Sequence, residues 1–145
     1  MFKGSFQFTI DAKGRVSIPS RFREILAERY EEKLVVTNDL DKCLVAFPFE
    51  EWSLIEQKIR DLPSSEPDVK AFMRFVYSRA TECELDRQGR VLIPPSLREY
   101  AELKRDVVIV GMGHKIEIWD PSLWDKAIAP DRFPAISETL ARLGF

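Results

Sequence analysis

Hydrophobic residues near the start of the chain recur at the spacing of strands and then of a helix. Phe6, Phe8 and Ile10 alternate with polar residues, which is the period of a half-buried β-strand. After a polar turn, Val16 and Ile18 continue the alternation and predict the returning strand of a hairpin. A helix is predicted next by apolar residues three and four positions apart, namely Phe22, Ile25, Leu26 and Tyr30.

The rest of the chain predicts two hairpins and several further helices. The hairpins are predicted by pairs of short apolar runs, 34–37 with 44–47 and 107–110 with 116–119. Helical spacing of apolar residues recurs at 52–62, 69–80 and 97–101. Prolines within 63–67 separate the first two of these helices, and a last short helix is predicted from about Ala135 to Leu143.

One segment of the sequence occurs twice. Residues 11–24 align with residues 86–99, 75 positions later, and eight of these 14 positions are identical. Further on, Trp52 corresponds to Trp124, 72 positions later, so the second copy is three residues shorter. A long unit present only twice predicts two halves of one pseudo-symmetric domain rather than a solenoid. The expected divisions are a first repeat with its trailing helix at 1–62, a linking helix at 63–80, and a second repeat with a C-terminal tail at 81–145.

Each copy contains a tight turn followed directly by an arginine. The shared residues are Asp11, Gly14 and Arg15 in the first copy and Asp86, Gly89 and Arg90 in the second. At the first position of a type I turn an aspartate accepts backbone N–H groups, and at the fourth a glycine tolerates positive φ. An arginine beside such a turn can project with little backbone freedom to lose, and its guanidinium suits phosphate or the major-groove edge of guanine.

The two arginines also have a purely structural interpretation. Arg15 can pair with Asp11, and Arg90 with Asp86, as contacts that stabilise each turn. Exposed ion pairs of this kind contribute about 0–1 kcal/mol. Both interpretations stay open on the residues alone, whereas Arg23 and Arg98, on the following helices, are expected to be structural.

Charge is distributed unevenly along the chain. The 145 residues include 22 Lys+Arg and 24 Asp+Glu, for a net charge of −2, and 45% are hydrophobic, enough to form a core. Residues 11–23 carry a net +3 and residues 86–98 a net +2, so the remainder carries −7. A local cationic surface on an acidic protein is what focused binding of an anion requires.

Residues that could support catalysis or metal binding are sparse. The one histidine, His114, falls in a predicted hairpin turn, and no metal-ligand spacing surrounds Cys43 or Cys83. We expect a solvated histidine, two reduced core cysteines, no enzyme activity, no metal and no cofactor. No apolar run is long enough to cross a bilayer, and no signal-peptide core follows Met1, so a cytoplasmic protein without membrane contact is expected.

Several segments together resemble one known family. Residues 1–4 (Met-Phe-Lys-Gly), 11–19, 82–94 and 117–119 are similar to the MraZ family of bacterial transcriptional regulators, and the resemblance covers nearly the whole chain. It implies an α+β fold, a β-barrel with helices. This fold would be a duplicated relative of the AbrB-like swapped-hairpin (double-split) barrel, with pseudo-twofold halves. It also implies assembly into a ring-shaped homo-oligomer.

The same resemblance implies a function and its residues. The expected function is a sequence-specific, nucleoid-associated repressor that binds double-stranded DNA at short direct repeats upstream of the division and cell-wall gene cluster. By correspondence with the family motif, Asp11, Arg15, Asp86 and Arg90 are motif residues in the turns completed by Gly14 and Gly89, and Lys13 and Arg87 are loop neighbours expected to contact DNA. Gln88 stands where the first turn has Lys13, so the halves are expected to contribute unequally. The alternative is an oligomeric protein-interaction module of the AbrB-like fold, whose basic turns bind an acidic partner.

Overall fold

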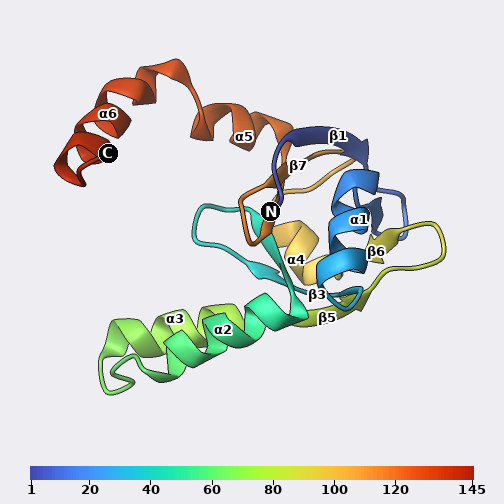
Figure 1. Ribbon diagram of the computed structural model, residues 1–145, viewed down its shortest axis with the longest axis horizontal. Helices are drawn as coiled ribbons and strands as arrows, with labels where there is room; N and C mark the ends of the chain where they lie inside the picture. The colour runs from blue at the N-terminus through green and yellow to red at the C-terminus, as the bar shows by residue number, and fades with distance from the viewer.

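Two similar series of elements make up the chain in a computed structural model of residues 1–145 (Figure 1). The first series is β1 (Ser5–Thr9), β2 (Arg15–Ser17), α1 (Ser20–Arg29), β3 (Lys33–Asn38), β4 (Leu44–Pro48), α2 (Phe49–Arg60) and α3 (Pro67–Tyr77). The second is β5 (Thr81–Glu84), β6 (Arg90–Leu92), α4 (Pro95–Tyr100), β7 (Asp106–Gly111), β8 (Ile116–Trp119), α5 (Pro121–Ala127), a 3-10 turn (Pro130–Arg132) and α6 (Phe133–Arg142). The predicted hairpins 34–37/44–47 and 107–110/116–119 and the helix near the C-terminus are therefore confirmed.

The two series exchange strands with each other. Six strands form one antiparallel sheet in the order β1-β7-β8-β4-β3-β5, so that β1 of the first series lies beside β7 and β5 of the second lies beside β3. Strands β2 and β6 form a separate two-stranded ribbon. The counterparts in the two series are β1 and β5, β3 and β7, and β4 and β8, and they occupy symmetric places in this strand order. The α+β fold of duplicated, swapped halves is therefore confirmed.

The hairpin expected from the alternation at residues 6–18 forms only at its turn. A single bridge joins Ile10 to Val16, and the Asp11 N–H donates to the Arg15 carbonyl, but β1 and β2 do not continue as a ladder. Instead β1 pairs along five residues with the hydrophobic strand β7, and β2 pairs with β6. The three-residue β2 offers β1 a shorter and less apolar partner than β7 does. Pairing between the two halves therefore replaces the local pairing of β1 with β2.

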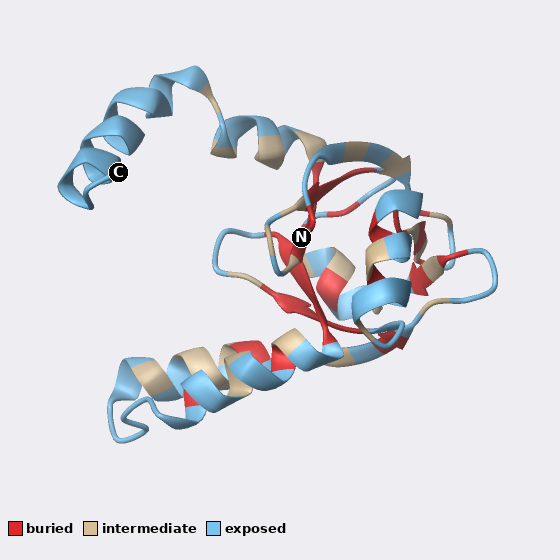
Figure 2. Cartoon of the chain, viewed as in Figure 1, coloured by how far each residue is buried: buried red, intermediate tan, exposed pale blue.

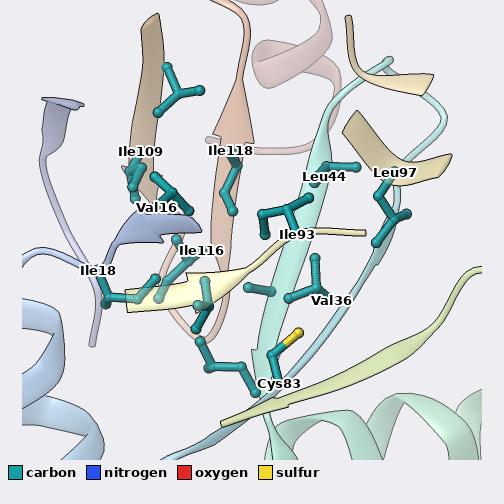
Figure 3. Packing of buried hydrophobic residues seen from close by; sticks show 14 of the residues in the cluster. Val16, Ile18, Val36, Leu44, Cys83, Ile93, Leu97, Ile109, Ile116 and Ile118 are labelled. Carbon is teal, nitrogen blue, oxygen red and sulfur yellow. The ribbon is translucent and has the colours of Figure 1, made fainter. Parts of the chain in front are cut away.

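The largest hydrophobic core is formed from both series. Its 20 buried side chains include Val16 and Ile18 from the first copy of the repeat and Val91 and Ile93 from the second. Figure 3 shows Val16, Ile18 and Ile93 packing against Ile116 and other side chains of the sheet. The divisions expected after residue 62 and before residue 81 fall between α2 and α3 and at the start of β5.

Helices cover the outer face of the sheet in two smaller clusters. The cluster under α2 and α3 has Val35, Val45, Phe47, Trp52 and Val76 as its buried members. The cluster under α5 has Cys43, Val108, Val110 and Trp119. The pattern analysis missed α5, which is seven residues long and begins at Asp120-Pro121, where the Asp120 carboxylate accepts the Leu123 N–H at 3.2 Å.

The α2–α3 pair and α6 extend away from the rest of the molecule, as Figure 1 shows. Every residue from 131 to 145 is exposed, in contrast to the buried strands (Figure 2). None of the helices combines the length and the apolar composition that a membrane span needs.

Candidate nucleic-acid interface

Pairing of β2 with β6 places the two repeated turns at the ends of one short ribbon. In the antiparallel register, Arg15 lies opposite Leu92, Val16 opposite Val91, and Ser17 opposite Arg90. Val16 and Val91 are almost fully buried, so the other four side chains lie on the opposite, outward face of the ribbon. Turns that are 75 residues apart in sequence thus flank a single surface, at the end of the molecule away from the α2–α3 pair and α6 (Figure 1).

Both turns have the same hydrogen-bonded structure. The Lys13 and Arg15 N–H groups donate to Asp11 Oδ1 at 3.0 and 2.8 Å. In the second turn the Gln88 and Arg90 N–H groups donate to Asp86 Oδ1 at 2.9 Å each. Gly14 and Gly89 donate back to the carbonyls of the two aspartates, at 2.9 and 3.0 Å, and close each turn. The turns predicted from Asp and Gly are confirmed.

Each motif arginine forms an ion pair with the aspartate of its own turn. Arg15 Nε donates to Asp11 Oδ2 at 2.6 Å, and Arg90 Nε donates to Asp86 Oδ2 at 2.9 Å. The Arg90 guanidinium also lies 4.0 Å from Asp11 Oδ2, which links the two turns. These side chains are 34% and 26% exposed. Because the pairs within each turn use Nε, they hold the guanidiniums in place without occupying the terminal amino groups, one of which on Arg90 makes the contact with Asp11. The structural interpretation of the arginines is thus confirmed, and it is compatible with ligand binding.

Glycine is required in the turns because the other half of the chain packs directly against them. Gly14 has φ +91°, and a Cβ there would lie 2.8 Å from the Ile93 carbonyl oxygen and 2.9 Å from the Arg98 guanidinium. The Ile93 N–H donates to the Gly14 carbonyl at 2.8 Å. Arg98 Nε in turn donates to the Ile93 carbonyl at 3.0 Å. Arg98 is therefore structural, as expected.

The second turn repeats this arrangement with residues of the first half. Gly89 has φ +72°, and a Cβ there would lie 2.5 Å from Arg23 Cδ. The Ile18 N–H donates to the Gly89 carbonyl at 2.9 Å, and Arg23 Nε donates to the Ile18 carbonyl at 3.1 Å. Each turn is thus held by the helix and strand of the opposite half.

Positive charge from two distant segments is brought together at the β2–β6 ribbon. The two segments that carry net charges of +3 and +2, residues 11–23 and 86–98, contain the paired strands, whereas the rest of the chain carries −7. Lys13 and Arg87 are exposed, one on each turn. The cations that both turns bring together favour binding of a polyanion at this face.

The carboxylates of both turns are held in their charged form. Hydrogen bonds lower the pKa of Asp11, chiefly the bond from the Arg15 backbone N–H and then the one from its side chain. The pKa of Asp86 is lowered in the same way by Arg90. The geometry of the arginines therefore persists throughout the neutral pH range.

The remaining residues considered from the sequence lie elsewhere. His114 is 64% exposed, with Nδ1 3.6 Å from Glu51 Oε1, which confirms a solvated histidine. Cys43 and Cys83 are free and buried, as predicted, and burial raises the pKa of Cys83 to about 11.

One cluster of possible metal ligands was not evident from residue spacing. Ligand atoms of Asp39, Cys43 and Glu117 lie within 4.8 Å of one another. Burial raises the pKa of the Cys43 thiol well above its usual range. Glu117 Oε1 already accepts the Trp119 indole N–H at 2.9 Å. Both carboxylates of this cluster thus have partners within the chain, since Lys115 Nζ lies 3.9 Å from Asp39 Oδ2.

The family model and the sequence relatives that match this chain agree on one family. The family model described as "MraZ protein, putative antitoxin-like" matches the chain twice, at residues 1–75 and 76–143. A protein of Desulfitobacterium hafniense named "Transcriptional regulator MraZ" is 47% identical over 99% of both chains. Proteins of the same name from Acetivibrio thermocellus and Carboxydothermus hydrogenoformans are 48% and 53% identical over 99% and 86% of this chain. The solution structure of PHS018 from Pyrococcus horikoshii covers 81% of this chain at 17% identity, with a TM-score of only 0.33.

Replacing Gly14 by alanine should destabilise the fold. The positive φ alone costs a non-glycine residue about 1–2 kcal/mol, and the added Cβ would collide with a backbone carbonyl that cannot move away alone. We expect the free energy of unfolding, measured by chemical denaturation, to fall by at least that amount. The matched control is Gly144→Ala, also at positive φ (+81°) but with nothing within 4 Å of the new Cβ and outside the cores. Equal stability of the two variants would contradict this account of the turn.

Acid should weaken the turns within a defined pH window. Because the pKa of Asp11 and Asp86 is lowered by folding, the unfolded chain takes up protons at a higher pH than the folded chain. Their stabilisation is fully present above the ordinary aspartate value of 3.8 and is lost as the pH falls from there through the lowered folded values. We expect the free energy of unfolding to fall more steeply below about pH 4 in the parent than in an Asp11→Asn/Asp86→Asn variant. Parallel pH curves would show that these pairs do not contribute.

Proposed function

The chain belongs to the MraZ family, and we propose that it regulates transcription by binding double-stranded DNA in a sequence-specific manner. The observation that carries this proposal is the β2–β6 ribbon, on which Arg15 and Arg90 are held by the aspartates of two equivalent turns. The names of the relatives support regulation of transcription, and the clustered positive charge supports DNA as the ligand. Regulation then requires binding alone, without a chemical step.

A two-stranded antiparallel ribbon has suitable dimensions for the major groove of B-DNA. With Nε engaged by aspartate, the terminal amino groups of Arg15 would donate to the O6 and N7 acceptors of guanine, and those of Arg90 would exchange the 4.0 Å contact with Asp11 for the same acceptors. The exposed cations Lys13 and Arg87, on the flanking turns, suit the phosphates on either side. In this proposal the turns position the ribbon and its outward side chains read the bases.

We further propose that the target is a set of short direct repeats upstream of the chain's own gene, at the head of the division and cell-wall gene cluster. The family resemblance directs the proposal to these repeats. A ring-shaped homo-oligomer would present several ribbons to tandem repeats on one duplex, and linked binding raises affinity without new contacts. Occupation of the repeats would exclude polymerase and repress the promoter, which places the protein at the nucleoid in the cytoplasm.

The C-terminal helix supports self-assembly. One stripe of α6 and the residues after it carries Phe133, Ile136, Leu140 and Leu143, which are 56%, 39%, 37% and 73% exposed. A helix of ten residues is only marginally stable in water without packing. The stripe therefore needs a partner surface to cover it. In a ring, each chain can present the same surface to the α6 stripe of the next chain. We propose that another copy of this chain covers α6.

Removing one guanidinium should weaken specific binding. We expect Arg15→Ala to lower affinity for the upstream repeats by about tenfold or more, because a bidentate contact to guanine contributes about 1–3 kcal/mol. Lys13→Ala should instead weaken binding to all DNA sequences alike and reduce the salt dependence of the affinity by about one phosphate contact. Titration of labelled duplex at several salt concentrations, with unrelated duplex as competitor, measures both effects.

The matched control for Arg15→Ala is Arg60→Ala, an exposed arginine in the last turn of α2. It should bind the repeats like the parent. Unchanged affinity in Arg15→Ala, with fold and assembly intact, would contradict the proposed function. Selective capture of an acidic protein, together with indifference to DNA, would favour the protein-interaction alternative.

Charging the apolar stripe of α6 should dissociate the assembly. We expect Ile136→Glu/Leu140→Glu to yield a smaller particle than the parent by light scattering after gel filtration, because a charge cannot be buried unpaired at an interface. Ser137→Glu/Thr139→Glu, which adds equal charge beside the stripe, is the control and should assemble normally. Equal masses of the parent and the stripe variant would exclude α6 from the interface.

A further inference from the structure

We propose that Leu92 is a specificity-determining residue that contacts the 5-methyl group of a thymine in the major groove and gives each chain a direction on DNA. This inference rests on the proposed function of the ribbon. It adds an apolar recognition element to the basic side chains already described.

The ribbon is symmetric in its arginines but not in its other outward positions. Arg15 and Arg90 are equivalent in the two copies and lie diagonally across the ribbon, opposite Leu92 and Ser17 respectively. The other diagonal is formed by Ser17 and Leu92, which are also equivalent positions of the repeat but differ in chemistry. A rotation of 180° about the local twofold axis would therefore exchange one arginine with the other. It would also exchange the leucine methyl groups with the serine hydroxyl.

Leu92 is exposed where the fold gives no reason for a leucine. Its side chain is 56% exposed, while its neighbours Val91 and Ile93 are 1% and 0% exposed in the core. Single exposed leucines are common on protein surfaces. Leu92, however, lies directly opposite Arg15, and such opposite side chains are about 5 Å apart at Cβ. An apolar group so close to a guanidinium would reach the groove together with it.

The major groove contains one apolar feature, the methyl group of thymine. With Arg15 donating to a guanine, a leucine beside it faces a neighbouring base pair, where a thymine methyl would remove its side chain from water. Ser17, at the equivalent place beside Arg90, offers a hydroxyl instead and suits a polar base edge. One chain would therefore read an asymmetric sequence, because the two orientations of the ribbon are chemically different.

This asymmetry matches the arrangement proposed for the target. A ribbon with identical halves would read a palindrome and bind each repeat equally well in either orientation. A ribbon with a leucine on one side and a serine on the other distinguishes the two orientations, which is what tandem repeats in one direction require. The flanking turns are also chemically different, because Lys13 of the first turn corresponds to Gln88 of the second.

The test removes only the methyl group from the DNA. In the upstream duplex protected by the assembled full-length protein, each thymine of the repeat is replaced in turn by deoxyuridine, which pairs identically but lacks the methyl. We expect one position at which this change weakens the parent about fourfold per repeat, the usual effect of exposing one such group. Leu92→Ser should bind thymine and deoxyuridine duplexes equally. Leu40→Ser, which changes a leucine 69% exposed in the β3–β4 turn, should retain the parent's discrimination.

Orientation is tested by the matching substitution on the other diagonal. Ser17→Leu would place leucine at both equivalent positions, and we expect it to bind duplexes with alternate repeats inverted almost as well as direct repeats, whereas the parent prefers direct repeats. The methyl contact would be overturned if Leu92→Ser still bound the thymine duplex more tightly than the deoxyuridine duplex. It would also be overturned if the parent bound both duplexes equally at every thymine position. An undiminished preference of Ser17→Leu for direct repeats would overturn the directional role. Failure of the parent to bind the repeats above competitor would instead refute the proposed function.

Discussion

The structure depends on the antiparallel pairing of two three-residue strands, β2 and β6. This pairing joins the halves of the chain, buries Val16 against Val91 in the common core, and brings two distant turns to one surface. It also explains why each turn is held by the opposite half, through the bonds from Ile93 to Gly14 and from Ile18 to Gly89. Neither copy of the repeat could complete its core or its turn alone, so folding and formation of the candidate interface are one event.

The pattern of identity between the two copies follows from this packing. Several identical residues support the backbone: an aspartate that closes the turn, a glycine without room for a Cβ, and an arginine on the following helix that donates to the carbonyl just after the strand. Some positions that differ, such as Ser17 against Leu92, lie on the outward face of the ribbon. The duplicated scaffold is thus constrained to remain symmetric, whereas the surface that meets a ligand is free to become asymmetric.

The motif arginines show that a structural role and a binding role need not compete. An ion pair through Nε fixes the direction of the guanidinium and lowers the entropy that binding would otherwise cost. The lowered pKa of the two aspartates keeps this arrangement intact at neutral pH. Meanwhile the net positive charge is concentrated in the two segments that form the ribbon, because the remainder of the chain carries −7.

Local patterns in the sequence determined the two hairpins, most helices, the duplication and both Asp-Gly-Arg turns, because these depend on neighbours within a few residues. Residue spacing did not reveal that β1 leaves β2 for β7, or that Asp39 and Cys43 lie beside Glu117. It also left open whether Arg15 pairs with Asp11, and the structure shows that it does, with its side chain 34% exposed. Such features arise from pairing between residues some 70 to 100 positions apart, whose free energy comes from a core that neither half forms alone. Only the tertiary structure therefore decided that two weakly basic turns become one cationic surface.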